Sequence, residues 1–315
     1  MRGIVAVVGA GNTGASWAGL FAAHGYAVRL YDQSEEATAR AVSRTESAAR
    51  FLAAKGLAEP RLTEQGIRLL SPAADLGEAV AGALLVQECV TEDLDVKRSV
   101  FADIGRLAPA AALVASSTSG LSITAIQRDT NLPGRTLAAH PYNPPHLVPL
   151  VELAPGALTQ PETVERASEF YAGVGKDPVV IRRDVPGYIA NRVSAALWRE
   201  AIELVRSGVA TVEEIDRAIS LGPGLRWAVM GPHLIYHLGG GAAGLRGHIS
   251  HLTATKETIL RDLASWTTLP VDTADVLAAG VEAEAAGKSI EQLEAERDEA
   301  LAAVVLALRQ ARIQG

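Results

Sequence analysis

The sequence predicts an α/β protein: a doubly wound, mostly parallel sheet followed by an all-α C-terminal domain. Three observations support this fold class. Short apolar runs alternate with helical stretches up to about residue 182, and a glycine-rich turn follows the first of these runs. Beyond about residue 187 the pattern is helical only. We therefore expect residues 1–184 to form the first domain and residues 185–315 the second.

Composition and charge restrict the possible functions. The chain has 315 residues, 48% of them hydrophobic, which is enough for two domains with their own cores. Its net charge of −7 argues against nucleic acid as a partner, because such binding depends on neutralising phosphates. No apolar run reaches the length of a membrane span, and we expect a cytoplasmic protein without a membrane partner. The single cysteine, Cys89, lies in an apolar run and is expected to be a buried thiol.

The clearest local pattern is at the start of the chain. Ile4–Val8 is a continuous apolar run, typical of a strand buried on both faces. The glycines Gly9, Gly11 and Gly14 follow it and open a helical stretch, and Asp32 closes the next expected strand. A GxGxxG turn between a strand and a helix, with an acid at the end of the second strand, is the Rossmann-type pattern for dinucleotide binding.

Each residue type in this turn suits NAD. Gly9 permits the tight turn, Gly11 lets the backbone approach a pyrophosphate, and Gly14 lets the helix pack closely on the strand. The helix N-terminus favours the negative charge of the phosphates. Asp32 can accept hydrogen bonds from the adenosine ribose and would repel a 2′-phosphate, so NAD is expected rather than NADP. The expected cofactor-binding residues of this region are Gly9, Gly11, Asn12, Thr13, Gly14 and Asp32.

The same alternation predicts the rest of the first domain. Ser34 is the expected N-cap of a long helix that ends near Lys55. The other expected helices are residues 75–82, 93–107 and 159–173, and the other expected strands are residues 27–31, 67–70, 83–89, 112–115, 136–140, 148–153 and 178–182.

The stretch 138–153 combines two expected strands with residues able to carry out chemistry. His140 ends the first strand, Glu152 lies in the second, and a proline-broken turn separates them. An imidazole and a carboxylate on neighbouring strands can form a general base and the group that orients it. The alternative is a buried structural histidine, with a glutamate that forms its salt bridge elsewhere. From this stretch alone both interpretations stay open.

The second domain is expected to consist of helices and their connections. The expected helices are residues 188–207, 212–220, 232–238 and 289–311. The segment 222–232, which contains Arg226 and Trp227, is expected to be irregular and rigid, and the triple glycine 239–241 is expected to connect helices. His248 and His251 are three residues apart, but no carboxylate or cysteine accompanies them in register, so no metal is expected.

These motifs together resemble the 3-hydroxyacyl-CoA dehydrogenase superfamily over essentially the whole chain. The family's fingerprint matches GAGNTG, its HxxNP signature matches HPYNP from His140, and its helix start matches PGYIANR. The resemblance implies NAD-dependent oxidation of an L-3-hydroxy acid to the 3-keto acid. It assigns proton transfer to His140, imidazole orientation to Glu152, and hydrogen bonds to the reacting oxygen to Ser119 and Asn191. With Asn191 in the second domain, the site would lie between the domains.

The resemblance also implies a role for two residues of the segment EDLDVK. Glu92 and Lys97 match positions that line the nicotinamide-ribose side of the cofactor. They complete the expected cofactor-binding set.

One segment, LGPGLRWAVMGP, departs from the acyl-CoA enzymes by inserting Arg226 and Trp227. It resembles the subgroup that contains L-carnitine dehydrogenase, L-gulonate 3-dehydrogenase and lambda-crystallin, whose substrates carry no CoA. Arg226 is a candidate for binding a substrate carboxylate, because a guanidinium pairs with a carboxylate bidentately. An ion pair that holds the loop is the alternative. Trp227, Trp198 and Tyr236 either form part of a cage for a trimethylammonium group or belong to an ordinary core.

The resemblance therefore predicts an NAD-dependent L-3-hydroxyacid dehydrogenase for a small, polar, CoA-free substrate that is carnitine- or gulonate-like. A short-chain L-3-hydroxyacyl-CoA dehydrogenase is the alternative within the same class. An NAD(H)-binding structural or sensor protein, similar to a crystallin, is the alternative from another class. The filled His140, Glu152, Ser119 and Asn191 positions argue against that last alternative. Because family members dimerise through the helical domain, a homodimer is expected.

Overall fold

The computed structural model describes residues 2–313. The chain divides into two compact units: residues up to Arg192 together with the chain from Asp298 onward, and Val193–Arg297. This division differs from the expected boundary after residue 184. Asn191 lies in the first unit with Ser119, and the last part of the chain belongs to the first unit as well.

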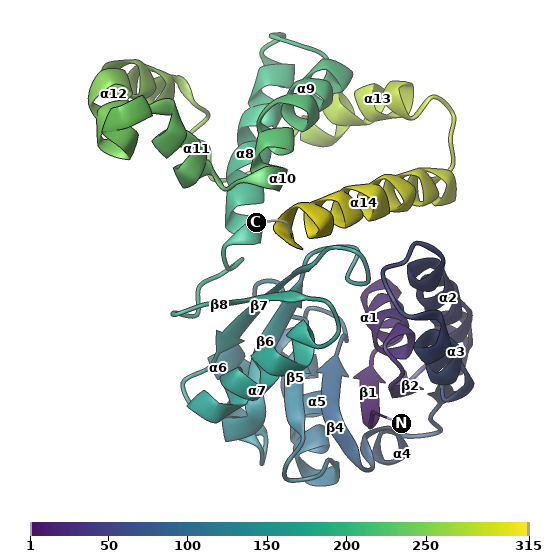
Figure 1. Cartoon of the computed structure of the whole chain (residues 1–315). Coiled ribbons are helices and arrows are strands. Elements are labelled where there is room, and N and C mark those ends of the chain that lie inside the picture. Colours follow the sequence, from purple (N-terminus) through teal and green to yellow (C-terminus); the bar gives the residue numbers. More distant parts are fainter. Residues whose placement is uncertain (1, 314–315) are drawn as a thin grey trace. The chain divides into compact units, whose positions relative to one another are not determined.

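Within residues 2–313, the first unit contains an eight-stranded sheet with the order β3-β2-β1-β4-β5-β6-β7-β8 (Figure 1). Of the paired strands described, only β6 and β7 run antiparallel. The strand order reverses between β1 and β4, and ligands of open α/β sheets bind at such a switch point. The strands are β1 (Ile4–Val8), β2 (Ala27–Tyr31), β3 (Ser71–Pro72), β4 (Ala83–Glu88), β5 (Leu113–Ser116), β6 (Thr136–Pro141), β7 (Leu150–Pro155) and β8 (Asp177–Val180).

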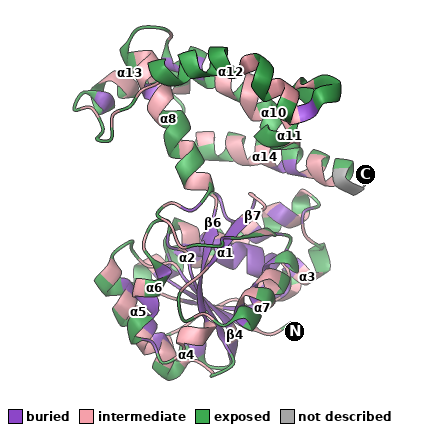
Figure 2. Cartoon of the chain, turned by 90° about the vertical axis from the view of Figure 1, so that its left-hand side faces the viewer, coloured by how far each residue is buried: buried purple, intermediate pink, exposed green. Residues whose placement is uncertain are grey.

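Helices cover both faces of this sheet, and the buried strands lie between them (Figure 2). Successive side chains of a strand point to opposite faces, so Val5 and Val7 join one apolar cluster and Ala6 and Val8 join the other. The first cluster includes residues of α1 (Asn12–Ala23), α2 (Glu35–Ala54), α7 (Pro161–Ala172) and α14 (Ile290–Ile313). The second cluster includes residues of α4 (Leu76–Val80), α5 (Leu94–Leu107) and α6 (Ile123–Ile126).

The expected strand at residues 67–70 is wrong. The chain there ends α3 (Pro60–Arg68), and the short β3 follows it. Pro60 begins the helix, a position where its missing N–H costs nothing. Gly66 packs on α1 so closely that a Cβ atom would lie 1.9 Å from the carbonyl oxygen of Ala22. A four-residue apolar run does not distinguish a strand from a helix end, and tertiary packing decides the outcome here.

The second unit is helical, as predicted. Its elements are most of α8 (Ala190–Arg206), then α9 (Val212–Ile219), α10 (Leu225–Val229), α11 (Pro232–Gly239), α12 (Gly244–Asp262), α13 (Thr273–Ala285) and the start of α14. Thr211 and Glu214 form a capping box that begins α9.

The segment 222–232 is more regular than predicted. Ser220–Gly224 forms a π-helical turn that leads directly into α10. Pro223 lies inside this turn and lacks the N–H that an α-helical hydrogen bond requires. At Gly224 a Cβ atom would lie 2.8 Å from the carbonyl oxygen of Ile219. The proline and this glycine therefore fit a wider helical turn.

None of the helices in residues 2–313 combines the length and the apolar character needed to cross a membrane.

Candidate active site

His140 and Glu152 lie directly opposite each other in the β6–β7 pair. The Nδ1 atom of His140 is 2.9 Å from Oε2 of Glu152. Because a carboxylate only accepts hydrogen bonds, we assign the ring proton to Nδ1, which leaves a lone pair on Nε2. Both side chains are buried, at 4% and 1% exposure. The arrangement makes Nε2 of His140 the atom able to take a proton.

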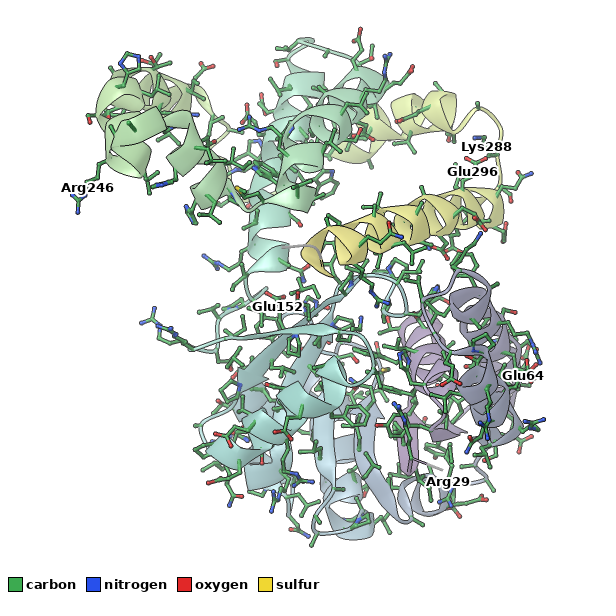
Figure 3. All side chains as sticks on the ribbon, in the orientation of Figure 1. Arg29, Glu64, Glu152, Arg246, Lys288 and Glu296 are labelled. Carbon is green, nitrogen blue, oxygen red and sulfur yellow. The ribbon has the colours of Figure 1, made fainter. Side chains whose placement is uncertain are left out.

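The second oxygen of Glu152 accepts two backbone hydrogen bonds where α8 begins. The N–H groups of Ile189 and Ala190 donate to Oε1 at 2.8 and 3.0 Å. Burial raises the pKa of Glu152, but the hydrogen bonds from His140, Ala190 and Ile189 outweigh it, so the pKa lies below its ordinary value. Glu152 (Figure 3) is therefore an anion that holds the imidazole in one orientation.

His140 opens onto a pocket of about 340 Å³ that also brings together Ser119 and Asn191. The side-chain amide nitrogen of Asn191 lies 3.4 Å from Nε2 of His140. Three of the four expected catalytic residues thus line one pocket, and Glu152 lies directly behind His140. The lining residues are Thr13, Ser117, Ser119, His140, Pro141, Tyr142, Asn143, Pro145 and Asn191.

Glu92 fixes the loop that carries Ser119. Its Oε1 atom accepts hydrogen bonds from the Thr118 hydroxyl at 2.6 Å and from the N–H groups of Ser119 and Gly120 at 2.8 and 3.0 Å. Partial burial raises the pKa of Glu92, but these hydrogen bonds and the charge of Lys97 lower it more, so the net shift is downward. Glu92 is therefore an anion that positions the backbone beside the pocket.

Lys97 is buried, at 1% exposure, in a network with Glu88. Its Nζ atom is 2.7 Å from Oε1 of Glu88 and 3.5 Å from Oε2 of Glu92. Burial raises the pKa of Glu88 despite the opposing effects of Lys97 and of the Ser116 hydroxyl, which donates to Oε2 at 2.5 Å. Glu88 was not a predicted site residue. The sequence signal that could have identified it is a lone acid at the end of an apolar strand.

The glycine-rich turn has the shape that a pyrophosphate requires. Gly9 has a φ of +102°, a conformation that side chains disfavour. A Cβ atom on Gly14 would lie 1.9 Å from the carbonyl oxygen of Gly9, whereas a Cβ atom on Gly11 would meet nothing within 4 Å. Gly14 is therefore needed for close packing, and the backbone at Gly11 is open to a ligand. These residues fit the diphosphate of a dinucleotide.

Asp32 holds this turn in place from the end of β2. Its Oδ2 accepts from the N–H of Ala10 at 2.8 Å, and its Oδ1 accepts from the N–H of Ser34 at 3.0 Å. A carboxylate has further lone pairs for ribose hydroxyls. Asn12 accepts a hydrogen bond from Arg44, and Thr13 reaches the pocket that contains His140. The turn thus joins the expected cofactor site to the pocket.

Family comparisons agree with this arrangement. Residues 4–185 match the model for the 3-hydroxyacyl-CoA dehydrogenase NAD-binding domain, and residues 187–279 match the model for the C-terminal domain of the same family. The chain belongs to the 3-hydroxyacyl-CoA dehydrogenase family. It is an NAD-dependent oxidoreductase that acts on the CH–OH group of a hydroxy acid.

Individual relatives cover nearly the whole dehydrogenase. An L-carnitine dehydrogenase from Streptomyces griseus is 43% identical, with 93% of this chain and 86% of the relative covered. One from Bacillus cereus is 41% identical, with 94% and 90% covered. Among solved structures, the NAD⁺-dependent dismutase 5-formyl-3-hydroxy-2-methylpyridine 4-carboxylic acid 5-dehydrogenase has a TM-score of 0.83 and 32% identity, with 98% and 99% covered. Escherichia coli 3-hydroxybutyryl-CoA dehydrogenase has a TM-score of 0.67 and 30% identity, with 89% and 57% covered.

Two expected substrate-binding residues of the dehydrogenase, Arg226 and Trp227, lie on α10 in the second unit. Trp227 is 39% exposed. Of the other aromatic candidates, Trp198 is exposed on α8, and Tyr236 stacks on His248 with ring centroids 4.8 Å apart. Contact between these residues and a substrate stays a prediction.

Sequence reasoning missed the residues that follow His140 in the pocket wall. Tyr142, Asn143 and Pro145 all line the pocket. Their signal was present, because they belong to the same HPYNPP segment that identified the histidine. This segment therefore carries His140 and also shapes the pocket onto which His140 opens.

Proposed function

We propose that this dehydrogenase oxidises the 3-hydroxyl of a small, polar, CoA-free L-3-hydroxy acid, carnitine- or gulonate-like, to the 3-keto acid, and catalyses the reverse reduction. One observation carries this proposal: the His140–Glu152 pair opens onto a pocket that Ser119 and Asn191 also line. The identity of about 40% to L-carnitine dehydrogenases, over more than 90% of the chain, supports the substrate class.

His140 acts as the general base in the oxidation. Bound NAD⁺ supplies the hydride acceptor. Nε2 of His140 takes the hydroxyl proton while the C–H bond of the same carbon breaks. The hydrogen of that bond leaves as a hydride, and the C–O bond becomes a carbonyl. A histidine suits this step because it can accept and return a proton near neutral pH. Glu152 stabilises the imidazolium that forms.

Ser119 and Asn191 act on the reacting oxygen. In the reduction direction this oxygen gains negative charge, so donors placed there stabilise the transition state. The Ser119 hydroxyl and the Asn191 amide can both donate, and Glu92 holds the backbone that carries Ser119. These donors also hold the reacting oxygen beside His140.

Arg226 and Trp227 are proposed to recognise the rest of the substrate. A guanidinium binds a free carboxylate through two parallel hydrogen bonds, and an indole ring attracts a quaternary ammonium group. A substrate with both groups, such as carnitine, uses both residues. An acyl-CoA thioester has neither group at those positions. Recognition by Arg226 and Trp227 would therefore distinguish CoA-free hydroxy acids from acyl-CoA substrates.

A substrate panel tests the proposal. NAD⁺ reduction is measured with L-carnitine, L-gulonate and L-3-hydroxybutyrate. NADH oxidation is measured with acetoacetyl-CoA, with free 3-keto acids and with 5-formyl-3-hydroxy-2-methylpyridine 4-carboxylic acid. Within NADH oxidation, we expect a higher kcat/KM with a CoA-free keto acid than with the thioester. A higher kcat/KM with acetoacetyl-CoA would identify a short-chain hydroxyacyl-CoA dehydrogenase instead. No turnover at all, with NADH still bound, would favour a structural or sensor role.

We further propose a homodimer formed through the helical unit. Large apolar side chains are exposed along its helices, and such surface is expected to be covered by a partner. The exposed apolar residues of this unit include Leu225, Val229, Leu234, Leu238, Ile249, Ile259 and Leu260. Light scattering after gel filtration tests this proposal, and a monomer mass at micromolar concentration would contradict it.

We also propose that the protein is cytoplasmic, where NAD is available as a diffusible cofactor. Cell fractionation followed by immunodetection tests the location. Recovery outside the cytoplasmic fraction would contradict it.

A further inference from the structure

Lys176 is a buried lysine with no role in the chemistry described above. It directly precedes β8 and is 7% exposed. The ion pairs found within residues 2–313 do not include Lys176, and its Nζ atom lies 4.7 Å from the centroid of the Trp17 ring. Burying an ammonium without a carboxylate costs free energy, and a methionine of similar length would avoid that cost. The hydrogen bonds of this amino group should therefore explain why a lysine occupies this buried position.

Both hydrogen bonds of Lys176 go to one loop. Its Nζ atom donates to the carbonyl oxygen of Pro145 and, at 2.7 Å, to the carbonyl oxygen of Val148. These carbonyls belong to residues 142–149, the post-histidine loop, which connects the end of β6 to β7. Tyr142 and Asn143 of the same loop line the pocket that contains His140. Lys176 thus bonds the loop that forms part of the wall of the substrate pocket.

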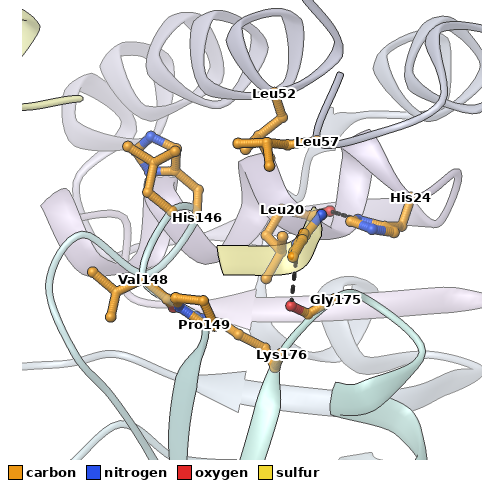
Figure 4. Close-up of a pocket in the computed structure, with 11 residues that line it drawn as sticks. Leu20, His24, Leu52, Leu57, His146, Val148, Pro149, Gly175 and Lys176 are labelled. Atoms are coloured by element: carbon orange, nitrogen blue, oxygen red, sulfur yellow. Dashed lines mark hydrogen bonds between the residues drawn. The ribbon is translucent and has the colours of Figure 1, made fainter. Parts of the chain in front are cut away.

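A small cavity lies on the Lys176 side of this loop (Figure 4). It has a volume of about 10 Å³, and its wall includes Val148 and Pro149 of the loop together with Lys176. Leu52 and Leu57 form the opposite side of this cavity (Figure 4). Leu147 of the loop packs in the first apolar cluster, and packing is incomplete only at this small cavity. The hydrogen bonds of Lys176 add a constraint on that side of the loop.

A second tether holds the middle of the loop. The Nδ1 atom of His146 lies 2.8 Å from the Ser16 hydroxyl, and the N–H of His146 donates to the same hydroxyl at 2.9 Å. Ser16 belongs to α1, the helix that follows the glycine-rich turn. Lys176 therefore holds the loop at Pro145 and Val148, on either side of the His146 tether.

We propose that Lys176 is a positioning residue of the dehydrogenase. It holds the post-histidine loop at the distance from His140 that the substrate pocket requires, and so sets the affinity for the hydroxy acid. It leaves the affinity for NAD and the rate of the chemical step largely unchanged. This inference rests on the proposed function, because it assigns the same pocket to the hydroxy acid.

The test is Lys176→Met, which keeps the length of the side chain and removes its donors. We expect KM for the best hydroxy acid of the panel to rise by about tenfold, while kcat and the Kd for NADH stay within about threefold. Hydrogen exchange of the amides of residues 146–148 should become faster. Lys288→Met is the matched control, because Lys288 is exposed and bonds Glu296 on the helical part of the chain. It should change none of these values.

Lys176→Gln makes the same test if Lys176→Met does not fold, because its shorter, polar side chain withdraws the donor from the carbonyls of Pro145 and Val148. Unchanged KM in a folded variant, with only a lower Tm, would overturn the inference and leave Lys176 a stabilising residue. A collapse of NADH binding would overturn it as well. If the wild type turns over no hydroxy acid, the proposed function fails. The hydrogen-exchange comparison still decides whether Lys176 holds the loop, and unchanged exchange overturns that part.

Discussion

Residues 140 and 152 are register partners in the antiparallel β6–β7 pair, and this pairing brings the imidazole of His140 to 2.9 Å from the carboxylate of Glu152. Directly opposed residues of an antiparallel pair place their side chains on the same face of the sheet. A one-residue shift in register would move one of the two side chains to the other face. The strand pairing therefore supplies the orientation of the catalytic base.

His140→Gln should abolish turnover and leave cofactor binding intact. Glutamine cannot take the hydroxyl proton, so kcat should fall by about 10³-fold or more. The Kd for NADH, measured by fluorescence quenching, should stay within a few-fold of the wild type. A collapse of NADH binding would instead show that His140 maintains the fold of the site.

Glu152 should contribute to stability at neutral pH and lose that contribution in acid. Its folded-state pKa lies below the ordinary value of 4.5, so the unfolded chain binds more protons as the pH falls. The contribution is complete above about pH 5 and disappears as the pH falls through the folded-state pKa. Urea unfolding of the wild type and Glu152→Gln should differ by about 1–3 kcal/mol at pH 7. A difference that is the same at pH 7 and pH 3.5 would contradict this assignment.

Lys176 should produce a pH dependence of the same sign as that of Glu152, at higher pH. Burial lowers the pKa of Lys176 from 10.5 to about 7. Between these values the unfolded chain holds a proton that the folded protein lacks, so this residue makes the folded state more stable as the pH rises. Relative to Lys176→Met, the free energy of unfolding of the wild type should rise between pH 7 and pH 10, by at most about 1.4 kcal/mol per pH unit. The groups near it are His24, His146 and Arg309, which line the same cavity. A flat difference between wild type and variant would show that Lys176 keeps its ordinary pKa.

The ring of Tyr188, rather than its hydroxyl, should matter for activity. The ring lies 5.3 Å from that of His140, centroid to centroid, and the residue has a φ of +47° at 1% exposure. Its buried hydroxyl has no hydrogen-bond partner among residues 2–313. Tyr188→Phe should therefore raise the free energy of unfolding by about 1 kcal/mol and keep kcat within about threefold. Tyr188→Ala should lower both stability and kcat, because it removes the ring against His140. Lower stability in Tyr188→Phe would show that the hydroxyl has a partner, such as a bound water.

Local patterns account for the parts of the molecule that were predicted correctly. The strand–turn–helix of residues 4–23, the Ser34 cap and the two strands around His140 depend on residues close together in sequence. Two apolar runs separated by a proline-broken turn were sufficient to suggest the His140–Glu152 pair, and the register of β6 and β7 shows that the two residues meet.

Long-range contacts account for what was missed. Nothing in the local sequence distinguishes Lys176 from a surface lysine. Its hydrogen bonds go to backbone carbonyls 28 and 31 residues away. Glu88 forms its salt bridge with a residue of α5, and the ring of Tyr188 packs against a residue of β6. The end of α3 occupies part of the short apolar run that was predicted to be a strand. Packing of this helix on α1 outweighs the weak local preference of the run for a strand.

The discontinuity of the first unit has a consequence for synthesis on the ribosome. Ala302 and Val305 of α14 are buried in the same apolar cluster as Trp17 and Leu30. Domains generally fold as the chain emerges, from the N-terminal end first. Here the dinucleotide-binding unit lacks part of its core until all of Val193–Arg297 has been translated. Until α14 is translated, the nascent unit therefore exposes the apolar surface that Ala302 and Val305 cover in the folded protein.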